Sequence, residues 1–410
     1  MISLCMIVKD EAATLARTLA TVQGVVGEIV VVDTGSTDDT VAIAQSYGAK
    51  IHSFDWANDF AAARNESLRH ATGEWVLVLD ADEVLLSETA QVLQSLDQGQ
   101  PLGDIAAGDV LALNLLRLEL SAPQAPYTLI TRCFRRLPEI TFNRPYHETV
   151  DDSVAALQAQ DARWQVITLG EVALHHTGYD PAIVVQRGKF DRARTTMEGY
   201  LAEHPDDGYL LNKLAALYVE SDQSAAALPL LNRALEQTET DDLTRYELHY
   251  HRALAQADHP DKAASDYEAA LAQAVPPRLK LGAWINYGSL KKAQGELEGA
   301  IDLFEQAIAA EPNLAIAHYN LGATHRARGY LDEAIAAYER AIALDPNYPE
   351  AHQNLGVARF KLGQLPEALR SFRRAIDIYE AVDPATAASL SQGVIALGIP
   401  PALLTQAGLM

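Results

Sequence analysis

The sequence predicts an α/β domain with a largely parallel sheet, followed by an all-α superhelix, and three observations support this prediction. Short β-branched runs alternate with amphipathic stretches over about the first 175 residues, as expected of a sheet covered by helices. From about residue 208 onward the chain follows a fixed helical repeat. At 410 residues the chain also exceeds what one hydrophobic core normally serves, so two or more domains are expected.

Strands and helices are expected to alternate within the first domain. The expected strands are Ile2–Val8, Glu28–Val32, Lys50–His52, Trp75–Leu79, Val110–Arg117 and Gln165–Leu169. The expected helices are Glu11–Val22, Asp38–Tyr47, Asp59–His70 and Ser87–Leu96. Ligands of such sheets bind beyond the carboxyl ends of the strands, so the residues that follow each strand are candidates for function.

The second half repeats a helix–turn–helix unit. The positions that mark the unit recur 34 residues apart: Gly288, Gly322 and Gly356, with Phe304, Tyr338 and Phe372. Small residues where helices cross, and an aromatic wedge between them, are typical of tetratricopeptide (TPR) repeats. With two looser repeats in front, about five repeats are expected over 208–383, joined to the first domain (1–180) by a helix over 181–207. Residues 384–410 are expected to form a capping helix.

Composition argues against several classes of protein. A net charge of −23 argues against a nucleic-acid partner, because phosphate backbones bind basic faces. The two cysteines, Cys5 and Cys133, are too few for a disulfide framework, and their apolar flanks indicate buried, reduced thiols. No secretory signal or transmembrane run is recognisable. We therefore expect a cytoplasmic protein, with peripheral contact to the inner membrane left open.

Two carboxylates follow the strand Trp75–Leu79. Asp80 and Asp82 are two residues apart, so their side chains project to the same side, ~6.5–7 Å apart along the chain. Hard divalent cations prefer oxygen ligands, and Mg²⁺ or Mn²⁺ often bridges a carboxylate to substrate phosphates. A cation held there would neutralise charge on a departing diphosphate. The alternative is that these acids only end a strand and cap the following helix.

The strand Glu28–Val32 also ends on an acid. Asp33 is followed by a glycine turn and a hydroxyl-rich run, in which Ser36 or Thr37 fits a helix N-cap. Helix capping and loop solubility explain most of that run, but they do not explain Asp33. Asp33 is therefore a candidate to accept hydrogen bonds from a base or a ribose.

Four collinear motifs carry a resemblance to a known family. They are Met6–Glu11, Val31–Asp38, Ala63–Glu66 and Leu79–Glu83. In order and spacing they resemble the GT-A nucleotide-sugar domain, a Rossmann-like fold, of the family 2 inverting glycosyltransferases. The chain is similar in particular to the branch of lipooligosaccharide β-1,4-glucosyltransferases and TPR-tailed, sublancin-type peptide S-glycosyltransferases. Later segments also resemble motifs of that branch: Phe134–Arg136, His147–Glu148 and His175–Tyr179.

The resemblance implies a set of donor-binding residues. The residues implied to bind the nucleotide sugar are Glu11, Asp33, Arg64, Asp80 and Arg135. Asp33 would recognise the nucleoside, with Glu11 nearby, and Arg64 would face the base or the diphosphate unless it is a helix-surface arginine. Asp80 and Asp82 would hold ribose and metal. Arg132 and Arg135, which flank Phe134, would meet the diphosphate or the acceptor. The branch usually has Asn where this chain has Asp10, a small change at a helix entry.

The resemblance also implies catalytic and metal-binding residues. An inverting transfer needs a carboxylate to take the proton of the acceptor, and Glu148 is the candidate, with His147 as a neighbouring hydrogen-bonding group. A surface acid in an irregular loop is the alternative for Glu148. The metal, Mn²⁺ or Mg²⁺, would be held by Asp82 and by His175 or His176, with His176 favoured. The alternative for the histidine is interdomain packing.

These features predict a metal-dependent inverting glycosyltransferase. It would move a hexose from a nucleotide sugar, by analogy a UDP-sugar, to a protein or peptide acceptor engaged by the TPR groove. One alternative is transfer to a lipid-linked or lipopolysaccharide glycan, and another is a TPR binding scaffold with a degenerate transferase domain. A nucleotidyltransferase would show a glycine-rich phosphate loop after the first strand, where this chain has none. The protein-acceptor hypothesis predicts that deleting residues beyond about 207 abolishes transfer to a protein acceptor and spares donor hydrolysis.

Overall fold

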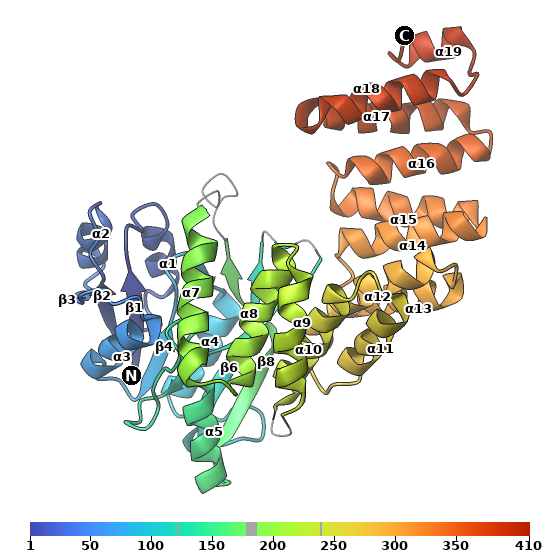
Figure 1. Ribbon diagram of the computed structural model, residues 1–410. Helices are drawn as coiled ribbons and strands as arrows, with labels where there is room; N and C mark the ends of the chain where they lie inside the picture. Colours follow the sequence, from blue (N-terminus) through green and yellow to red (C-terminus); the bar gives the residue numbers. More distant parts are fainter. Residues whose placement is uncertain (121, 123, 178–186, 238–239) are drawn as a thin grey trace. The chain divides into compact units, whose positions relative to one another are not determined.

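The computed structural model divides the chain into two units, one of Met1–Ala122 with Pro126–Ala255 and another that contains Gln256–Met410 (Figure 1). The structure describes every residue except 121, 123, 178–186 and 238–239. The strands are β1 (Ile2–Val8), β2 (Glu28–Asp33), β3 (Lys50–Ser53), β4 (Trp75–Val78), β5 (Glu83–Leu85), β6 (Val110–Glu119), β7 (Tyr127–Arg135) and β8 (Gln165–His176). The helices of the first unit are α1 (Leu15–Thr21), α2 (Thr40–Ser46), α3 (Phe60–His70), α4 (Ser87–Asp97), α5 (Asp151–Gln160), α7 (Arg187–Glu203), α8 (Gly208–Glu220), α9 (Ser224–Leu235) and α10 (Asp242–Ala255).

All the strands named above belong to one mixed sheet, in the order β3-β2-β1-β4-β7-β6-β8-β5. The half from β3 to β4 is parallel throughout, as the alternation of strands and helices predicts. In the other half, β6 and β8 are parallel, whereas β7 is antiparallel to both of its neighbours and β5 is antiparallel to β8. The sheet is therefore less parallel than a Rossmann-like sheet with helices on every crossover.

Helices cover both faces of this sheet. On one face, Leu4 and Met6 of β1 share a core with α1, α2 and α4. On the other face, Val76 and Val78 of β4 share a core with residues of α3 and α5. Cys5 and Cys133 are both buried free thiols, as expected.

The connection between β4 and β5 requires the sheet to curl. In a flat sheet, four strand spacings of about 4.8 Å would separate these two strands by about 19 Å. The chain has only the short turn Leu79–Asp82 with which to cross that distance, and a fully extended chain covers at most about 3.5 Å per residue. The curl folds the β8–β5 edge back toward the carboxyl end of β4, where Asp80 and Asp82 lie.

Three elements differ from the expectation. β5, β7 and α5 are present although the sequence pattern did not indicate them. The first five residues of β7 are all partly buried, so the period-2 alternation that identifies a strand is missing. In α5 only Val154 and Leu157 are buried, which leaves almost no amphipathic signal. β5 has three residues and is held by pairing with β8.

Helices α7–α10 belong to the same unit as the sheet, and Figure 1 shows α7 and α8 beside it. The helix expected to link the two domains, over 181–207, corresponds to α7, while residues 181–186 of that expected helix lie outside the described residues. α7 and α8 share an apolar core that contains Met197, Leu201 and Leu214.

The buried carboxylate of Glu28 joins the amino ends of several strands. Ser3 Oγ donates a hydrogen bond of 2.5 Å to it, Lys50 Nζ one of 2.6 Å, and the amide of Thr72 one of 2.8 Å. Burial by itself would raise the pKa of Glu28, but the hydrogen bonds from these three residues outweigh it and lower the pKa to about 2.

Glu28→Gln is expected to destabilise the protein at neutral pH by an amount that shrinks as the pH falls. Because the pKa of Glu28 is lower in the folded state, its contribution is fully present above the ordinary value of 4.5 and is lost as the pH falls toward about 2. Urea unfolding of wild type and variant, followed by circular dichroism from neutral pH downward, measures the difference. A difference independent of pH would contradict this account.

The second unit is a stack of antiparallel helices (Figure 1). Its helices are α11 (Pro260–Leu271), α12 (Leu281–Ala293), α13 (Leu297–Ala310), α14 (Ala315–Arg328), α15 (Leu331–Leu344), α16 (Pro349–Lys361), α17 (Leu365–Val382), α18 (Pro384–Ile395) and α19 (Pro401–Gln406). Gly329 ends α14 in the left-handed region, at φ 89°. Val394, Leu404 and Leu409 pack against the core of α17, and thus cover the apolar face of the last repeat.

The predicted glycine–aromatic contacts are confirmed in all three regular repeats. A Cβ atom added to Gly288, Gly322 or Gly356 would lie within 2.9 Å of the ring of Phe304, Tyr338 or Phe372, respectively. The two helices of each repeat therefore approach too closely for any side chain at the glycine.

Gly356→Ala is expected to destabilise the second unit by about 1–3 kcal/mol, because a buried ring has to move to admit the methyl group. Gly393→Ala, in α18, is the matched control, since no atom lies within 4 Å of its added Cβ. The control should be neutral or gain up to about 1 kcal/mol. Hydrogen exchange of peptides from α16 and α17, measured by mass spectrometry, checks the result. Equal protection in both variants would contradict it.

Among the helices of the described residues, none combines the length and the apolar character needed to cross a membrane.

Candidate active site

Asp80, directly beyond the end of β4, lies among three arginines. Its Oδ1 accepts a hydrogen bond of 2.6 Å from Arg64 Nη2, and its Oδ2 accepts one of 2.6 Å from Arg132 Nη2. Arg117 Nη1 is 4.0 Å from Oδ2. Burial would raise the pKa of Asp80, but the charges of the arginines outweigh it and hold the pKa well below its usual range. Asp80 is therefore anionic and fixed in direction.

Glu83 holds the turn after β4 in shape. Its carboxylate is fully buried and accepts hydrogen bonds from Arg117 Nη1 at 2.7 Å and Arg132 Nη2 at 3.2 Å. It also accepts one of 2.8 Å from the amide of Asp80, while the amide of Glu83 donates to the Asp80 carbonyl at 3.1 Å. This turn therefore presents Asp80 and Asp82 from a rigid backbone.

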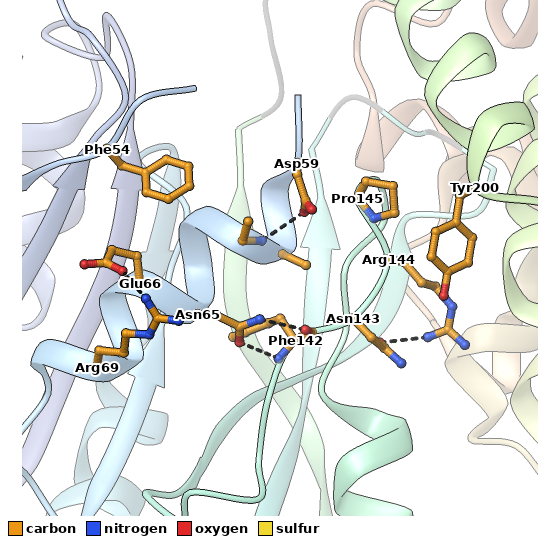
Figure 2. Close-up of a pocket in the computed structure, with 12 residues that line it drawn as sticks. Phe54, Asp59, Asn65, Glu66, Arg69, Phe142, Asn143, Arg144, Pro145 and Tyr200 are labelled. Carbon is orange, nitrogen blue, oxygen red and sulfur yellow. Dashed lines mark hydrogen bonds and ion pairs between the residues drawn. The ribbon is translucent and has the colours of Figure 1, made fainter. Parts of the chain in front are cut away.

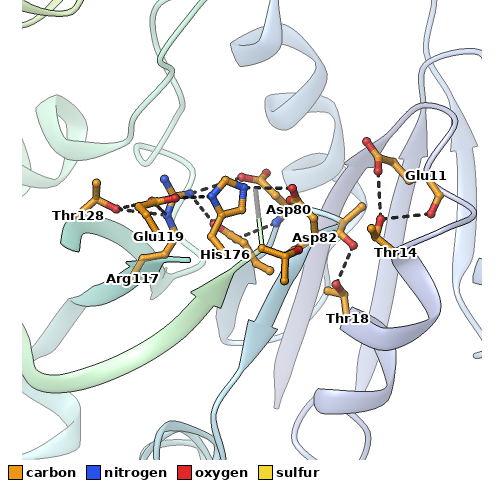
Figure 3. Close-up of polar contacts among 12 residues, drawn as sticks. Glu11, Thr14, Thr18, Asp80, Asp82, Arg117, Glu119, Thr128 and His176 are labelled. Carbon is orange, nitrogen blue, oxygen red and sulfur yellow. Dashed lines mark hydrogen bonds and ion pairs between the residues drawn. The ribbon is translucent and has the colours of Figure 1, made fainter. Parts of the chain in front are cut away.

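Asp82, His176 and Glu119 form a chain of hydrogen bonds (Figure 3). His176 Nε2 lies 3.1 Å from Asp82 Oδ2, and its Nδ1 lies 2.5 Å from Glu119 Oε2. The hydrogen bonds to Asp82 and Glu119 raise the pKa of His176 to about 10. Both carboxylates therefore stabilise positive charge on the ring, and a cation held by Nε2 would replace the proton shared with Asp82. Of the two neighbouring histidines, only His176 contacts Asp82. The pairing of β5 with β8 accounts for this, because it places His176 opposite Glu83, next to Asp82, and His175 opposite Val84.

The donor set of Asp82 and His176 fits a divalent cation. A histidine that ligates a metal usually donates its other ring N–H to a carboxylate, which is the relation between His176 and Glu119. In the part of the chain that the structure describes, no group of three or more His, Cys, Asp or Glu side chains is placed to hold a metal by itself. Mg²⁺ sites that use one or two protein ligands and complete the sphere with water and substrate phosphates are common.

Asp33 and Glu11 lie at the same edge of the sheet as Asp80. Asp33 pairs in register with Val8, the last residue of β1, and its carboxylate accepts hydrogen bonds from the amides of Gly35 and Ser36 at 3.2 and 3.1 Å. The backbone amide of Glu11 donates to Thr40 Oγ1 at 2.6 Å, which ties the two strand-end loops together. The loop from Asp33 is longer than expected before α2, which begins at Thr40.

Arg64 joins the strand-end acids to Glu148. Its side chain is 5% exposed, and its Nε donates a hydrogen bond of 2.5 Å to Glu148 Oε1 while Nη2 contacts Asp80. Within the described ranges, Oε2 of Glu148 makes no hydrogen bond. Arg64 is therefore not a helix-surface residue, and it holds Glu148 through one carboxylate oxygen, Oε1.

The neighbour of Arg64 anchors the loop that leads to Glu148. Asn65 Nδ2 donates to the carbonyl of Phe142, and the amide of Phe142 donates back to Asn65 Oδ1, each at 2.8 Å (Figure 2). The amide of Phe60 donates to the carbonyl of Pro145 at 3.0 Å. Helix α3 thus carries both the arginine that contacts Glu148 and the contacts that fix its loop.

The structure does not bring Arg135 or His147 to these acids. Arg135 pairs with Trp75 at the amino end of β4, the opposite end from Asp80, and bonds there to Glu74 and to backbone carbonyls. Because β7 is antiparallel to β4, the arginine nearer to the start of β7, Arg132, reaches Asp80 instead. His147 is exposed beside Tyr146, with ring centroids 5.0 Å apart. Gly178 and Tyr179 of the last motif lie outside the described residues.

Sequence reasoning missed Arg117, Glu119 and the role of Glu83. On β6, Arg117 contacts Glu83 and Glu119 contacts His176. The two residues are also joined to each other, because Arg117 Nε donates to Glu119 Oε1 at 2.6 Å. The available signal was their spacing, because two charged residues two apart, in an otherwise uncharged strand, share one face of the sheet.

Comparisons with known proteins agree with this architecture. The sequence matches the family described as Glycosyl transferase family 2 over residues 3–107. TPR repeat families match residues 184–247, 288–327, 324–363 and 349–381. A TPR repeat-containing protein of Synechococcus elongatus is 46% identical over 314 residues, 76% of this chain and 76% of that protein.

Two further relatives are named as glycosyltransferases. An uncharacterized glycosyltransferase of Rickettsia felis is 30% identical over 190 residues, 46% of this chain and 66% of that protein. The SPbeta prophage-derived glycosyltransferase SunS of Bacillus subtilis is 38% identical over 84 residues, 20% of each chain. The family match and the named relatives define an enzyme of the glycosyltransferase class. The chain carries a family 2 glycosyltransferase domain, matched over residues 3–107, followed by TPR repeats.

Proposed function

We propose that this enzyme transfers a hexose from a UDP-sugar to a protein or peptide, with inversion at the anomeric carbon and with Mn²⁺ or Mg²⁺ as cofactor. The observation that carries the proposal is the contact between Asp82 and His176, two residues beyond Asp80 at the carboxyl end of β4. Asp82 and His176 would hold the metal. When bound, a divalent cation supplies charge that offsets the departing diphosphate.

The donor nucleotide is proposed to bind along the carboxyl ends of β1, β2 and β4. Asp33 is proposed to accept hydrogen bonds from the nucleoside, and Asp80 from the ribose. The order of the parallel strands supports this assignment, because nucleotides bind such sheets beyond the carboxyl ends of neighbouring strands. Glu11 follows β1 and lies at the same edge of the sheet.

Glu148 is proposed to act as the general base. The hydroxyl or thiol of the acceptor attacks the anomeric carbon, the bond from that carbon to the diphosphate breaks, and the acceptor proton passes to Glu148. Its contact with Arg64 through Oε1 supports this role, because within the described residues Oε2 makes no hydrogen bond that would compete for the proton. The same arginine contacts Asp80, so donor-side and acceptor-side carboxylates share one rigid partner.

The TPR helices support a polypeptide acceptor, because surfaces lined by helical repeats commonly bind extended or helical segments. Transfer to a lipid-linked glycan is the competing outcome. Incubation of cell extract with enzyme and radiolabelled UDP-sugar distinguishes the two, since label would enter either the protein precipitate or the organic extract. Label in the organic extract alone would overturn the polypeptide assignment.

The donor assignment is tested on the isolated enzyme. With Mn²⁺ present, UDP should raise the melting temperature, because a ligand that binds the folded state stabilises it by about 2.7 kcal/mol at a hundred times its Kd. A panel of UDP- and GDP-sugars should then show UDP release from a UDP-sugar. Neither a shift nor release with any nucleotide, metal included, would favour a binding scaffold with a degenerate transferase domain.

A further inference from the structure

The loop that carries Glu148 is closed on itself but strained. An isolated β-bridge joins Asn143 to Thr149 at its ends. Between them, Arg144 and His147 adopt positive φ angles of 69° and 55°. Non-glycine residues in this region cost free energy and persist only where surrounding contacts impose them. Contacts from outside the loop must therefore hold its conformation.

Arg144 supplies such contacts. Its side chain is 7% exposed, and its Nε donates to Asp207 Oδ2 at 2.7 Å, while Nη2 lies 2.9 Å from Asp152 Oδ2. Its guanidinium stacks over the ring of Tyr209, 4.7 Å from the ring centroid. The guanidinium thus joins the Glu148 loop to α5 on one side and to the start of α8 on the other.

Asp207 has two tasks. It is the N-cap of α8, where its Oδ1 accepts a hydrogen bond of 2.8 Å from the amide of Leu210. Its other oxygen accepts from Arg144, and the side chain is 10% exposed. The first helix after the expected linker is therefore fastened, through one carboxylate, to the loop of the proposed general base.

One side of the loop lacks packing that could replace this contact. Asn143, Arg144 and Pro145 line a cavity of about 490 Å³, which is bounded across the gap by α3 and by Tyr200 of α7 (Figure 2). The loop is therefore positioned by polar contacts that involve Asn65, Arg64 and Arg144. It is also positioned by Tyr146, which packs against the ring of Phe60 and the core of α7 and α8.

We infer that Arg144 is a positioning residue for glycosyl transfer, which fixes the Glu148 loop against the N-terminus of α8 and makes that helix part of the active-site framework. This inference rests on the proposed role of Glu148. It revises the expectation from sequence that the chain can be cut beyond about 207 without harm to donor hydrolysis. Such a cut would leave Asp207 without the helix that it caps.

The test uses the full chain with point variants. Asp207→Asn preserves the N-cap, because Asn caps as well as Asp, but weakens the charge-assisted bond to Arg144. Asp383→Asn is the matched control, since Asp383 caps α18 in the second unit. Arg144→Met removes the contact, and Arg144→Lys restores part of it. The readouts are UDP release from a UDP-sugar with Mn²⁺, with kcat and KM separated, and hydrogen exchange of peptides that span 142–150.

For Arg144→Met we expect kcat to fall 10- to 100-fold with KM for the donor unchanged, since a small displacement of a catalytic group has an effect of this size. Asp207→Asn should lower kcat less, Arg144→Lys should recover part of it, and exchange in 142–150 should rise in step. Unchanged kcat in Arg144→Met, or exchange no faster than in Asp383→Asn, would overturn the inference. If wild type binds and releases no nucleotide, the proposed function fails, while the exchange data still decide whether Arg144 holds the loop.

Discussion

Asp82→Ala is expected to reduce UDP release from a UDP-sugar by about 10³-fold, because the variant loses one of the two side chains proposed to hold the cation that offsets the leaving diphosphate. The effect should fall on kcat, since charge on the diphosphate develops as the glycosidic bond breaks. In addition, Mn²⁺ should no longer enhance the rise in melting temperature that UDP produces. Steady-state release assays and thermal shifts, each with and without Mn²⁺, measure both effects.

Asp104→Ala is the control for Asp82→Ala, because Asp104 is an exposed acid of the same unit. It changes the net charge equally and should leave both measurements at wild-type values. An Asp82→Ala enzyme that releases UDP as fast as the Asp104→Ala enzyme would remove the metal assignment. The general base and the TPR acceptor surface would still stand as separate proposals.

Arg64→Met is expected to lower the free energy of unfolding by about 3–5 kcal/mol, because breaking a buried ion pair leaves uncompensated charge behind. Arg64 Nε and Nη2 contact Glu148 and Asp80 at 2.5 and 2.6 Å. Without the guanidinium, Glu148 loses its ion-pair partner, while Asp80 keeps only its contacts with Arg132 and Arg117. Arg64→Lys should be intermediate, since one ammonium group cannot reproduce two directed hydrogen bonds. Urea unfolding of the full chain, followed by circular dichroism, gives the values.

Arg69→Met, on the same helix, is the matched control. The Arg69 side chain is 75% exposed and pairs with Glu66 at 2.9 Å on the surface, where such pairs contribute about 0–1 kcal/mol. If the two methionine variants were equally stable, the ion pairs of Arg64 with Asp80 and Glu148 would contribute no more to stability than a surface pair.

The parallel half of the sheet and its acids could be predicted from the sequence, because strand-end position is a local property. Asp33 and Asp80 each follow an apolar run, and parallel strands place such residues at one edge. The glycine–aromatic contacts of the repeats are equally local, since each pair is separated by a constant distance along the chain.

What could not be predicted depends on the curl of the sheet and on antiparallel register. The contact between Asp82 and His176 joins residues far apart in the chain. Family resemblance suggested it, but no spacing rule predicts it. The sequence motif favoured Arg135 over Arg132 as a binding residue, because it does not show which end of β4 lies beside each arginine. Arg117 and Glu119 were missed because β6 pairs with strands that had not been placed.

The position of β8 in the chain has a consequence for biosynthesis. β8 is the last strand of the sheet in chain order, yet it brings His176 to Asp82 and pairs with β5, which directly follows the acidic turn. Since a nascent polypeptide emerges amino end first and domains fold as they emerge, the ribosome must have released almost the whole sheet before this corner can close. Asp80 and Glu83 can pair earlier with Arg64, Arg117 and Arg132, which all precede β8 in the chain. Asp82 has to wait for His176, so the pair proposed to hold the metal is completed last.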